Sequence, residues 1–413
     1  MPKTADAGPA ALDRTTVRRH TGSYHVPYDV TAMDFSIPGA RLETANVTEG
    51  DGSRGVVRVT RISRGPGITD YVTHEKEFTY STFGIHVGQD DRLTFFGEGQ
   101  RITVHLIDCR EDSARLGDEI TIHMAVSPHR VLIIPKGVAH TLDGLGGVVT
   151  RDEPVWYADR NPDWEPDNDL VSFLRTADVA PVVRTNRHEL PVAAHLLVSR
   201  MSQATNAQVR GAYGARFRVS IGGRTTYATL RPAWRAAETE AEAEADARRM
   251  IVRNNFVLTG PESFTVVPST DSCTSDVLEV RLDGQDGRFV RHEYSRRHLT
   301  WLAGSTDASI EVITEDGEHS VIPLGDPTIG VRIPPGTWYR LTGSGRIWLR
   351  SEMELLDLTP WQLDHPLGRD VTTADPAQAG PSRPEQEDDR YLPGPALHAL
   401  ARMEAKAIAL TTH

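Results

Sequence analysis

Short segments with the pattern of β-strands follow one another along most of this chain. Between residues 56 and 135 they are rich in β-branched and aromatic side chains, and Gly, Pro, Asp or Asn bounds each of them. In the segment 101–108, Ile102, Val104 and Leu106 occupy alternate positions, the period-two pattern of a half-buried strand. Many short strands separated by turn signals predict an antiparallel barrel or sandwich.

A second block of the same kind spans residues 216–355. Its segment 329–341 repeats the layout of 130–142: a strand, a Pro–X–Gly turn, two residues, and then a side chain directed back toward the barrel. We interpret this as an internal repeat. The predicted fold class is therefore mainly β, with two tandem barrels and a few helices.

The stretches between the strand-rich blocks set the expected boundaries. Helices are predicted within 171–178, 232–255 and 396–410 from their composition and spacing. The organisation expected along the chain is an N-terminal arm (1–40), a first barrel (41–180), a connector (181–210), a second barrel (211–370), and a linker with a C-terminal helix (371–413).

Charge and cysteine content limit the classes of function. The 45 Lys and Arg residues against 57 Asp and Glu residues give a formal net charge of −12, and an acidic surface does not attract nucleic-acid phosphates. The sequence has no apolar run long enough to span a membrane and no signal-peptide core. Two cysteines cannot build a disulfide framework. We therefore expect a cytoplasmic protein that binds neither nucleic acid nor membranes.

Residues 99–164 carry the most specific pattern. Within them, the motifs Asp-Cys-Arg at 108–110, Ser-Ala-Arg-Leu-Gly at 113–117 and the turn segment 134–145 follow at a spacing without gaps. This run resembles the dTDP-4-dehydrorhamnose 3,5-epimerase-like cupin family. The resemblance implies a double-stranded β-helix, or jelly-roll, barrel, and an enzyme that moves a proton on a carbon atom next to a carbonyl of a nucleotide-linked sugar.

The resemblance also implies roles for particular residues. Epimerisation beside a ketone needs a base, a cation or donor that holds the enolate, and an acid. His86 matches the family's base, and Arg92 stands closest to a family lysine. Arg110 matches a family arginine, although it also fits a structural ion pair. His140 ends the Pro–X–Gly turn, where it either lines the site or is a core histidine.

The family's catalytic acid is not in its expected place. Tyr157 matches the first tyrosine of the family's motif, but residues 162–164 replace the acid tyrosine, and 171–174 stand where an orienting aspartate is expected. Tyr157, Asp163 or His74 could supply a different acid. The resemblance therefore implies a single-site isomerisation, an elimination or a ring closure, on a nucleotide-linked keto-sugar or a related natural-product intermediate.

Residues 287–341 of the second block resemble, more weakly, the sugar 3,4-ketoisomerase cupins. His292 keeps one histidine of that pattern, whereas Tyr294 and Tyr339 replace two others. Two alternatives follow for the second barrel. It is either a structural or dimerising barrel, or it carries a second or shared site at these three residues.

Two other functions stay open for the first barrel. A metal-dependent bicupin oxygenase or isomerase would need a ligand set, and His74, His86, Glu98 and His140 could provide one for iron or zinc. A non-catalytic sugar-binding barrel is the third alternative. The leading interpretation needs no cofactor and expects a small, sugar-nucleotide-like substrate. The resemblance implies a homodimer through exchanged edge strands, unless the repeat makes that pairing within one chain.

Overall fold

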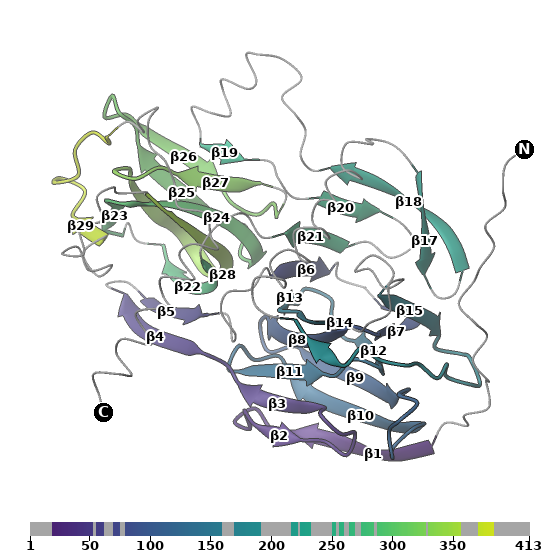
Figure 1. Cartoon of the computed structure of the whole chain (residues 1–413). Helices are drawn as coiled ribbons and strands as arrows, with labels where there is room; N and C mark the ends of the chain where they lie inside the picture. Colours follow the sequence, from purple (N-terminus) through teal and green to yellow (C-terminus); the bar gives the residue numbers. More distant parts are fainter. Residues whose placement is uncertain are drawn as a thin grey trace, which may run out of the picture.

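The described part of the chain is built of β-strands. The computed structural model describes residues 19–52, 55–61, 69–74, 79–158, 169–190, 216–221, 224–232, 250–252, 256–259, 264–268, 274–284, 287–327, 329–356 and 371–383. The regular elements in these ranges are all strands, and they confirm the mainly β fold with two tandem barrels (Figure 1). No helix in the described ranges is long and apolar enough to cross a membrane.

The first barrel consists of two facing sheets. One runs β1 (Arg19–Val26), β10 (Asp118–Ala125), β9 (Arg101–Asp108), β12 (Val138–Asp143), β7 (Thr82–His86) and β15 (Leu170–Leu174). The other includes β6 (Asp70–His74), β13 (Val149–Asp152), β8 (Gln89–Phe96), β11 (Arg130–Ile134), β3 (Arg41–Thr44) and β2 (Met33–Asp34). Alternate side chains such as Val104, Ile122 and Leu132 fill the space between the sheets. Two short strands, β14 (Val155–Ala158) and β16 (His188–Glu189), continue from β8.

Part of the expected N-terminal arm belongs to this barrel. Strand β1 pairs in parallel with β10, and Val26, Phe35 and Ile37 are buried in the barrel core. Residues 1–18 lie outside the described residues. The two sheets therefore recruit apolar side chains from before residue 41.

The helix predicted within 171–178 is wrong. Residues 170–174 form strand β15, which pairs with the edge of β7 over its whole length. Phe173 stacks on Phe83 with ring centroids 5.2 Å apart, so pairing and packing at the sheet edge outweigh the local helical preference. The helix predicted within 396–410 and nearly all of that within 232–255 lie outside the described residues.

The second barrel repeats the strand order of the first. One sheet runs β29 (Val371–Ala374), β23 (Phe289–His292), β28 (Trp338–Leu355), β25 (Ala308–Ile313) and β26 (His319–Pro323). The other includes β22 (Thr274–Asp283), β28 again, β24 (Ser295–Gly304), β27 (Gly330–Ile333) and β19 (Ile251–Val252). The long strand β28 takes the places that β12 and β13 hold in the first barrel. The start of the expected C-terminal linker thus contributes a strand, β29, to this barrel.

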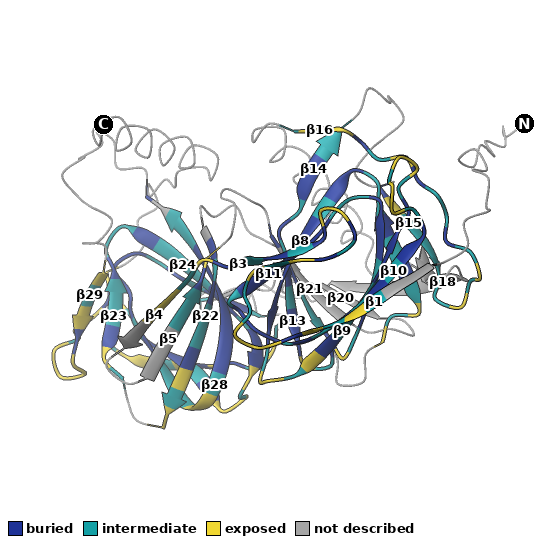
Figure 2. Cartoon of the chain, turned by 90° about the horizontal axis from the view of Figure 1, so that it is seen from below, coloured by how far each residue is buried: buried dark blue, intermediate teal, exposed yellow. Residues whose placement is uncertain are grey.

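The two barrels exchange strands. The hairpin of β4 (Val47–Gly52) and β5 (Gly55–Thr60) precedes β6 in the chain but pairs with β22 of the second barrel. In return, β21 (Phe264–Pro268) precedes β22 but pairs with β6 of the first barrel, and β20 (Phe256–Thr259), β18 (Arg224–Pro232) and β17 (Arg216–Ile221) continue outward from it. Figure 2 shows β4 and β5 beside β22, within the other barrel. Strand exchange thus occurs between the two halves of one chain.

A buried arginine holds the exchanged strand. Arg151 has no exposed surface and donates hydrogen bonds of 3.0 Å to the carbonyl oxygens of Thr60 and Arg61, at the end of β5. Its guanidinium also lies 2.8 Å from the buried carboxylate of Glu153. An apolar cluster that includes Phe96 and Trp348 seals the boundary between the barrels.

Replacing Arg151 by methionine is expected to lower the free energy of unfolding by about 3–5 kcal/mol, because Glu153 loses its buried counterion and β5 loses its anchor. Urea denaturation followed by tryptophan fluorescence measures this change. Arg184→Met is the matched control, since Arg184 is 66% exposed and lies 3.7 Å from Glu111, so its cost is about 0.5 kcal/mol or less. Equal stabilities of the two variants would contradict the anchoring role.

Candidate active site in the first barrel

Three strands bring polar side chains together at one end of the first barrel. His86 is the last residue of β7, Asp91 lies near the start of β8, and His140 lies in β12 opposite Gly84 of β7. The backbone N–H of Gly137 donates a 2.6 Å hydrogen bond to the carbonyl of His86. The Pro–Lys–Gly turn is therefore fixed to the strand that carries His86.

Only glycine fits position 137 of this turn. Gly137 has a φ of +76°, a left-handed conformation that other residues rarely adopt. A Cβ atom there would also collide with the side chains of Arg110 and Thr185. The glycine of this motif is thus required for the backbone turn that positions His140 three residues later.

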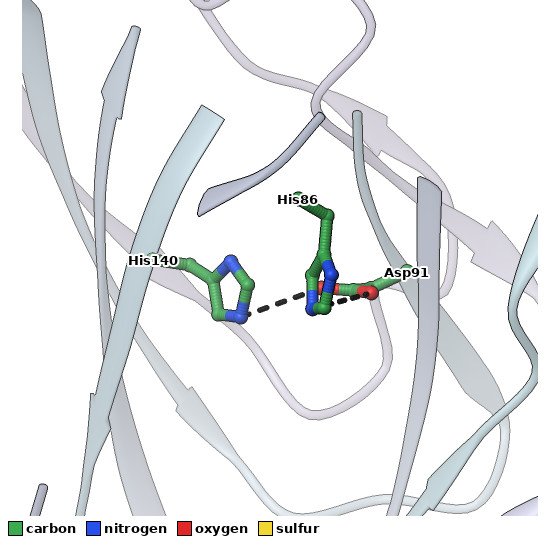
Figure 3. Close-up of side chains that lie close together, drawn as sticks. All are labelled: His86, Asp91 and His140. Carbon is green, nitrogen blue, oxygen red and sulfur yellow. Dashed lines mark ion pairs between the residues drawn. The ribbon is translucent and has the colours of Figure 1, made fainter. Parts of the chain in front are cut away.

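The two histidine rings face one carboxylate. The Nε2 atom of His86 lies 3.7 Å from Oδ1 of Asp91, and the Nε2 atom of His140 lies 3.3 Å from its Oδ2 (Figure 3). The rings are stacked, with centroids 5.9 Å apart and planes 20° from parallel. The His86 and His140 side chains keep 22% and 15% of their surface exposed.

A second carboxylate orients His86 from behind. The Nδ1 atom of His86 lies 2.9 Å from Oδ2 of Asp169, and the other oxygen of Asp169 accepts a 2.5 Å hydrogen bond from the N–H of Gly88. Ionised Asp169 can only accept, so Nδ1 of His86 carries a proton and donates it. This leaves Nε2 of His86 directed toward Asp91 and His140.

Sequence reasoning missed both carboxylates. Asp169 directly precedes β15, two residues before the segment 171–174 at which the resemblance placed the orienting aspartate. Asp91 was passed over in favour of its neighbour Arg92. Period-two alternation along β8 is the signal that could have found it, because successive side chains point to opposite faces of the sheet.

The carboxylates set the protonation state of His86. Burial alone would lower the pKa of His86, but Asp91, Asp169 and Asp152 outweigh it and raise the pKa to about 9. Burial dominates at His140 and lowers its pKa, with Asp91 opposing this effect. At neutral pH His86 is therefore an imidazolium beside a neutral His140. Environments that push two pKa values apart are typical of acid–base sites.

The two candidate arginines pair with carboxylates other than Asp91 and Asp169. Arg92 donates a 2.9 Å hydrogen bond to Oε2 of Glu43, on the face of β8 opposite to Asp91. Arg110 makes a two-pronged contact with Asp108, at 2.8 and 2.6 Å. Arg110 thus makes the structural ion pair that the sequence left open, and Arg92 is not the charge that accompanies His86.

Tyr157 also points away from the candidate site. Its hydroxyl donates a 2.9 Å hydrogen bond to Oδ2 of Asp90, and strand alternation places Asp90 on the face opposite to Asp91. The ammonium group of Lys136 lies 3.4 Å from the centre of the Tyr157 ring. Tyr157 therefore belongs to a separate polar cluster behind the strand.

The structure does not bring the other first-barrel candidates to the histidines. His74 lies on β6, where its Nδ1 atom is 3.1 Å from the carbonyl oxygen of Val148 and burial lowers its pKa to about 4. Glu98 is exposed at the end of β8 remote from Asp91. Asp163 lies outside the described residues. The predicted metal set therefore does not assemble, and Asp91 joins His86 and His140 instead.

The second barrel brings two of its three candidates together. The Nε2 atom of His292 lies 3.1 Å from the hydroxyl oxygen of Tyr339, and the two rings stack with centroids 5.9 Å apart. Tyr294 is half-buried, and its carbonyl oxygen accepts a hydrogen bond from the N–H of Leu356.

Comparison with known proteins shows a likeness of fold. No protein-family model and no curated protein matches the sequence. Among solved structures, the dTDP-6-deoxy-D-glucose-3,5-epimerase of Legionella pneumophila, in complex with dTDP-4-keto-L-rhamnose, is 13% identical, with a TM-score of 0.27. The matched region covers 40% of this chain and 89% of the epimerase chain.

Two other solved structures span most of the chain. The 7S globulin of Momordica charantia is 9% identical with a TM-score of 0.25, and covers 74% of this chain and 81% of its own. The oxalate decarboxylase of Lactobacillus farciminis is 9% identical with a TM-score of 0.26. The match covers 81% of this chain and 92% of the decarboxylase chain. These scores are too low to transfer a residue role from any of the three proteins.

Asp91→Asn is expected to lower the pKa of His86 by at least about 1 unit, because a neutral amide no longer stabilises the imidazolium. Nitrogen-detected NMR titration of labelled histidines measures this. The folded pKa of about 9 lies above the value of about 6.5 expected in the unfolded chain. His86 therefore stabilises the fold fully below pH 6.5, and this contribution is lost as the pH rises through 9. An unchanged His86 titration in Asp91→Asn would contradict the assignment.

Proposed function

We propose that the first barrel is the active site of an isomerase or epimerase-like enzyme. In this proposal His86 removes a proton from a carbon atom next to a carbonyl of a small sugar-like substrate, such as a nucleotide-linked keto-sugar. The observation that carries the proposal is the hydrogen bond from Nδ1 of His86 to Asp169. It leaves Nε2 of an oriented imidazole directed toward Asp91 and His140, on a side chain that keeps 22% of its surface exposed.

The two carboxylates make His86 a strong base. When Nε2 takes a proton, the resulting imidazolium lies between Asp169 and Asp91, which both stabilise it. The same charges make the neutral imidazole scarce, at about 1% of molecules at pH 7 for a pKa of about 9. Proton abstraction therefore becomes faster as the pH rises toward 9.

One acid–base residue suits a reaction on one face of the substrate. Tyr157 donates its hydroxyl proton to Asp90 on the other face of β8, so it is not placed to return a proton to the substrate opposite to His86. His86 itself can return the proton from the side on which it was taken. This supports a single-site isomerisation, or an elimination or ring closure, over an inversion at two carbon atoms.

Hydrogen–deuterium exchange at the substrate's acidic carbon tests the proposal. With dTDP-4-keto-L-rhamnose as the first probe in deuterated water, the wild-type protein is expected to introduce deuterium next to the carbonyl, which mass spectrometry detects. His86→Asn is expected to abolish this exchange, and Asp169→Asn to slow it by about 10²–10⁴-fold.

The matched control is His105→Asn, because His105 contacts Asp143 on the outer face of β9 and not the site. Exchange that persists at the wild-type rate in His86→Asn would refute the base assignment. Saturable probe binding without exchange in any variant would favour the non-catalytic sugar-binding barrel.

The dependence of kcat/KM on pH distinguishes a base from an acid. If His86 acts as the base, kcat/KM rises with pH and levels off above about 9. Asp91→Asn should move this limb to lower pH, since the histidine then loses its proton more easily. A limb that falls through pH 9 would show that the imidazolium is the active form and would contradict the proposal.

A metal-dependent bicupin is the second candidate, because one observation favours it. Ligand atoms of His86, Asp91 and His140 all lie within 4.8 Å of one another. Two histidines and one carboxylate suit Fe²⁺, Mn²⁺ or Zn²⁺, and Asp169 holds His86 through Nδ1 as carboxylates behind metal ligands commonly do. These three side chains would hold the ion, which would polarise a substrate oxygen.

Metal content tests this alternative. If the site binds metal, protein dialysed against Zn²⁺ or Mn²⁺ and then desalted is expected to hold one ion per chain by elemental analysis. Asp91→Asn would lose it and His74→Gln would keep it. Binding would weaken at lower pH, because protons compete for His86. Equal metal content in Asp91→Asn and the wild type would exclude this set of ligands.

A further inference from the structure

A glutamine joins two carboxylates beside His86. The Nε2 atom of Gln89 donates a 2.6 Å hydrogen bond to Oδ1 of Asp91 and a 3.3 Å hydrogen bond to Oδ2 of Asp152. Ionised carboxylates only accept hydrogen bonds, so the nitrogen of the amide, and not its oxygen, faces them. The two partners therefore fix the orientation of the Gln89 amide.

Strand geometry brings these three side chains to one face. Residues two apart on a strand point to the same face, so Gln89 and Asp91 of β8 project together. Asp152 of β13 pairs with Leu93 of β8 and lies on this face as well. Gln89 and Asp91 are buried, and the buried Trp156 of β14 is opposite Gln89 in the strand register. The hydrogen bonds of the amide are thus largely shielded from bulk water, which strengthens them.

The bond from Gln89 restrains the carboxylate that the two histidines face. Oδ1 of Asp91, which accepts this bond, is also the oxygen 3.7 Å from Nε2 of His86. Its Oδ2 lies 3.3 Å from Nε2 of His140. Rotation of the carboxylate would break the hydrogen bond from Gln89. One amide therefore keeps one oxygen of Asp91 directed toward each histidine.

The amide also lies between two charges of the same sign. Asp91 and Asp152, together with Asp169, raise the pKa of His86. Neighbouring carboxylates repel each other, and this repulsion favours protonation of one of them. An N–H donor shared by both stabilises their ionised forms. Gln89 therefore helps to keep Asp91 and Asp152 charged beside the imidazole.

We propose that Gln89 is a positioning residue of the candidate active site, which holds Asp91 toward His86 and His140 and joins it to Asp152. Gln89 acts through Asp91 and does not itself contact the reacting atoms. The inference rests on the function proposed for the first barrel, because Asp91 takes part in that reaction through His86.

Nitrogen-detected NMR titration of labelled histidines, without substrate, tests the proposal. Gln89→Met keeps the length of the side chain but removes the donor, so Asp91 turns away or takes up a proton. This is expected to lower the pKa of His86 by at least about 0.5 unit. In the Asp91→Asn background the same change should produce less than about half that shift, because residues that act through one contact are not additive. A full shift in that background would contradict the route through Asp91.

The dependence of kcat/KM on pH gives a second measurement. In the deuterium-exchange assay, Gln89→Met is expected to move the rising limb to lower pH, in the same direction as Asp91→Asn. Absence of exchange in the wild-type protein would refute the proposed function. The NMR titration would still decide whether Gln89 positions Asp91, so the two failures are distinguishable.

Gln100→Met is the matched control, because Gln100 follows β8 at the end remote from Asp91 and lies beside Gly97. It is expected to leave the titration of His86 unchanged. Gln89→Asn keeps the test valid should Gln89→Met fold poorly, since it retains the amide but is one methylene too short to reach both carboxylates. A His86 titration in Gln89→Met or Gln89→Asn that equals that of the wild type would overturn the proposal.

Discussion

Backbone hydrogen bonds that cross between the two halves of the chain are the constraint on which this structure depends. Strand β5 completes the sheet of the second barrel and β21 extends that of the first, so each half covers a strand edge of the other. Arg151 ties the end of β5 to the first barrel through two carbonyl oxygens. The sheet that receives β21 also contains β8, the strand that carries Asp91. The strand that carries Asp91 thus belongs to the sheet that joins the two barrels.

The site concentrates negative charge around one imidazole. Asp169 fixes its orientation through Nδ1, and Asp91 faces Nε2. This arrangement favours any positive species at Nε2, whether a transferred proton or a metal ion. Both functions proposed for the barrel therefore depend on the negative electrostatic potential that Asp91 and Asp169 create at His86. They differ in what occupies the space between His86, Asp91 and His140.

The sequence predicts the architecture better than it predicts the site. Period-two alternation and the two Pro–X–Gly turns indicate tandem barrels. A strand that is buried on one face alternates apolar and polar residues, so this burial can be read directly from the sequence. The proximity of His86 and His140 depends on pairing between β7 and β12, and the turn motif anticipates it. The position of Asp169 beside His86 depends on the pairing of β15 with the edge of β7, and the residues around Asp169 do not predict this pairing.

The reciprocal exchange of strands has an evolutionary consequence. Loss of either half would expose a sheet edge of the other, and exposed edges promote aggregation. Selection for solubility therefore favours keeping the second barrel, whatever chemistry it performs. Its residues can then vary independently of the reaction in the first barrel, as Arg297 and Tyr339 illustrate at the positions equivalent to Asp91 and His140. The two barrels are therefore retained together even where the second takes no part in the reaction of the first.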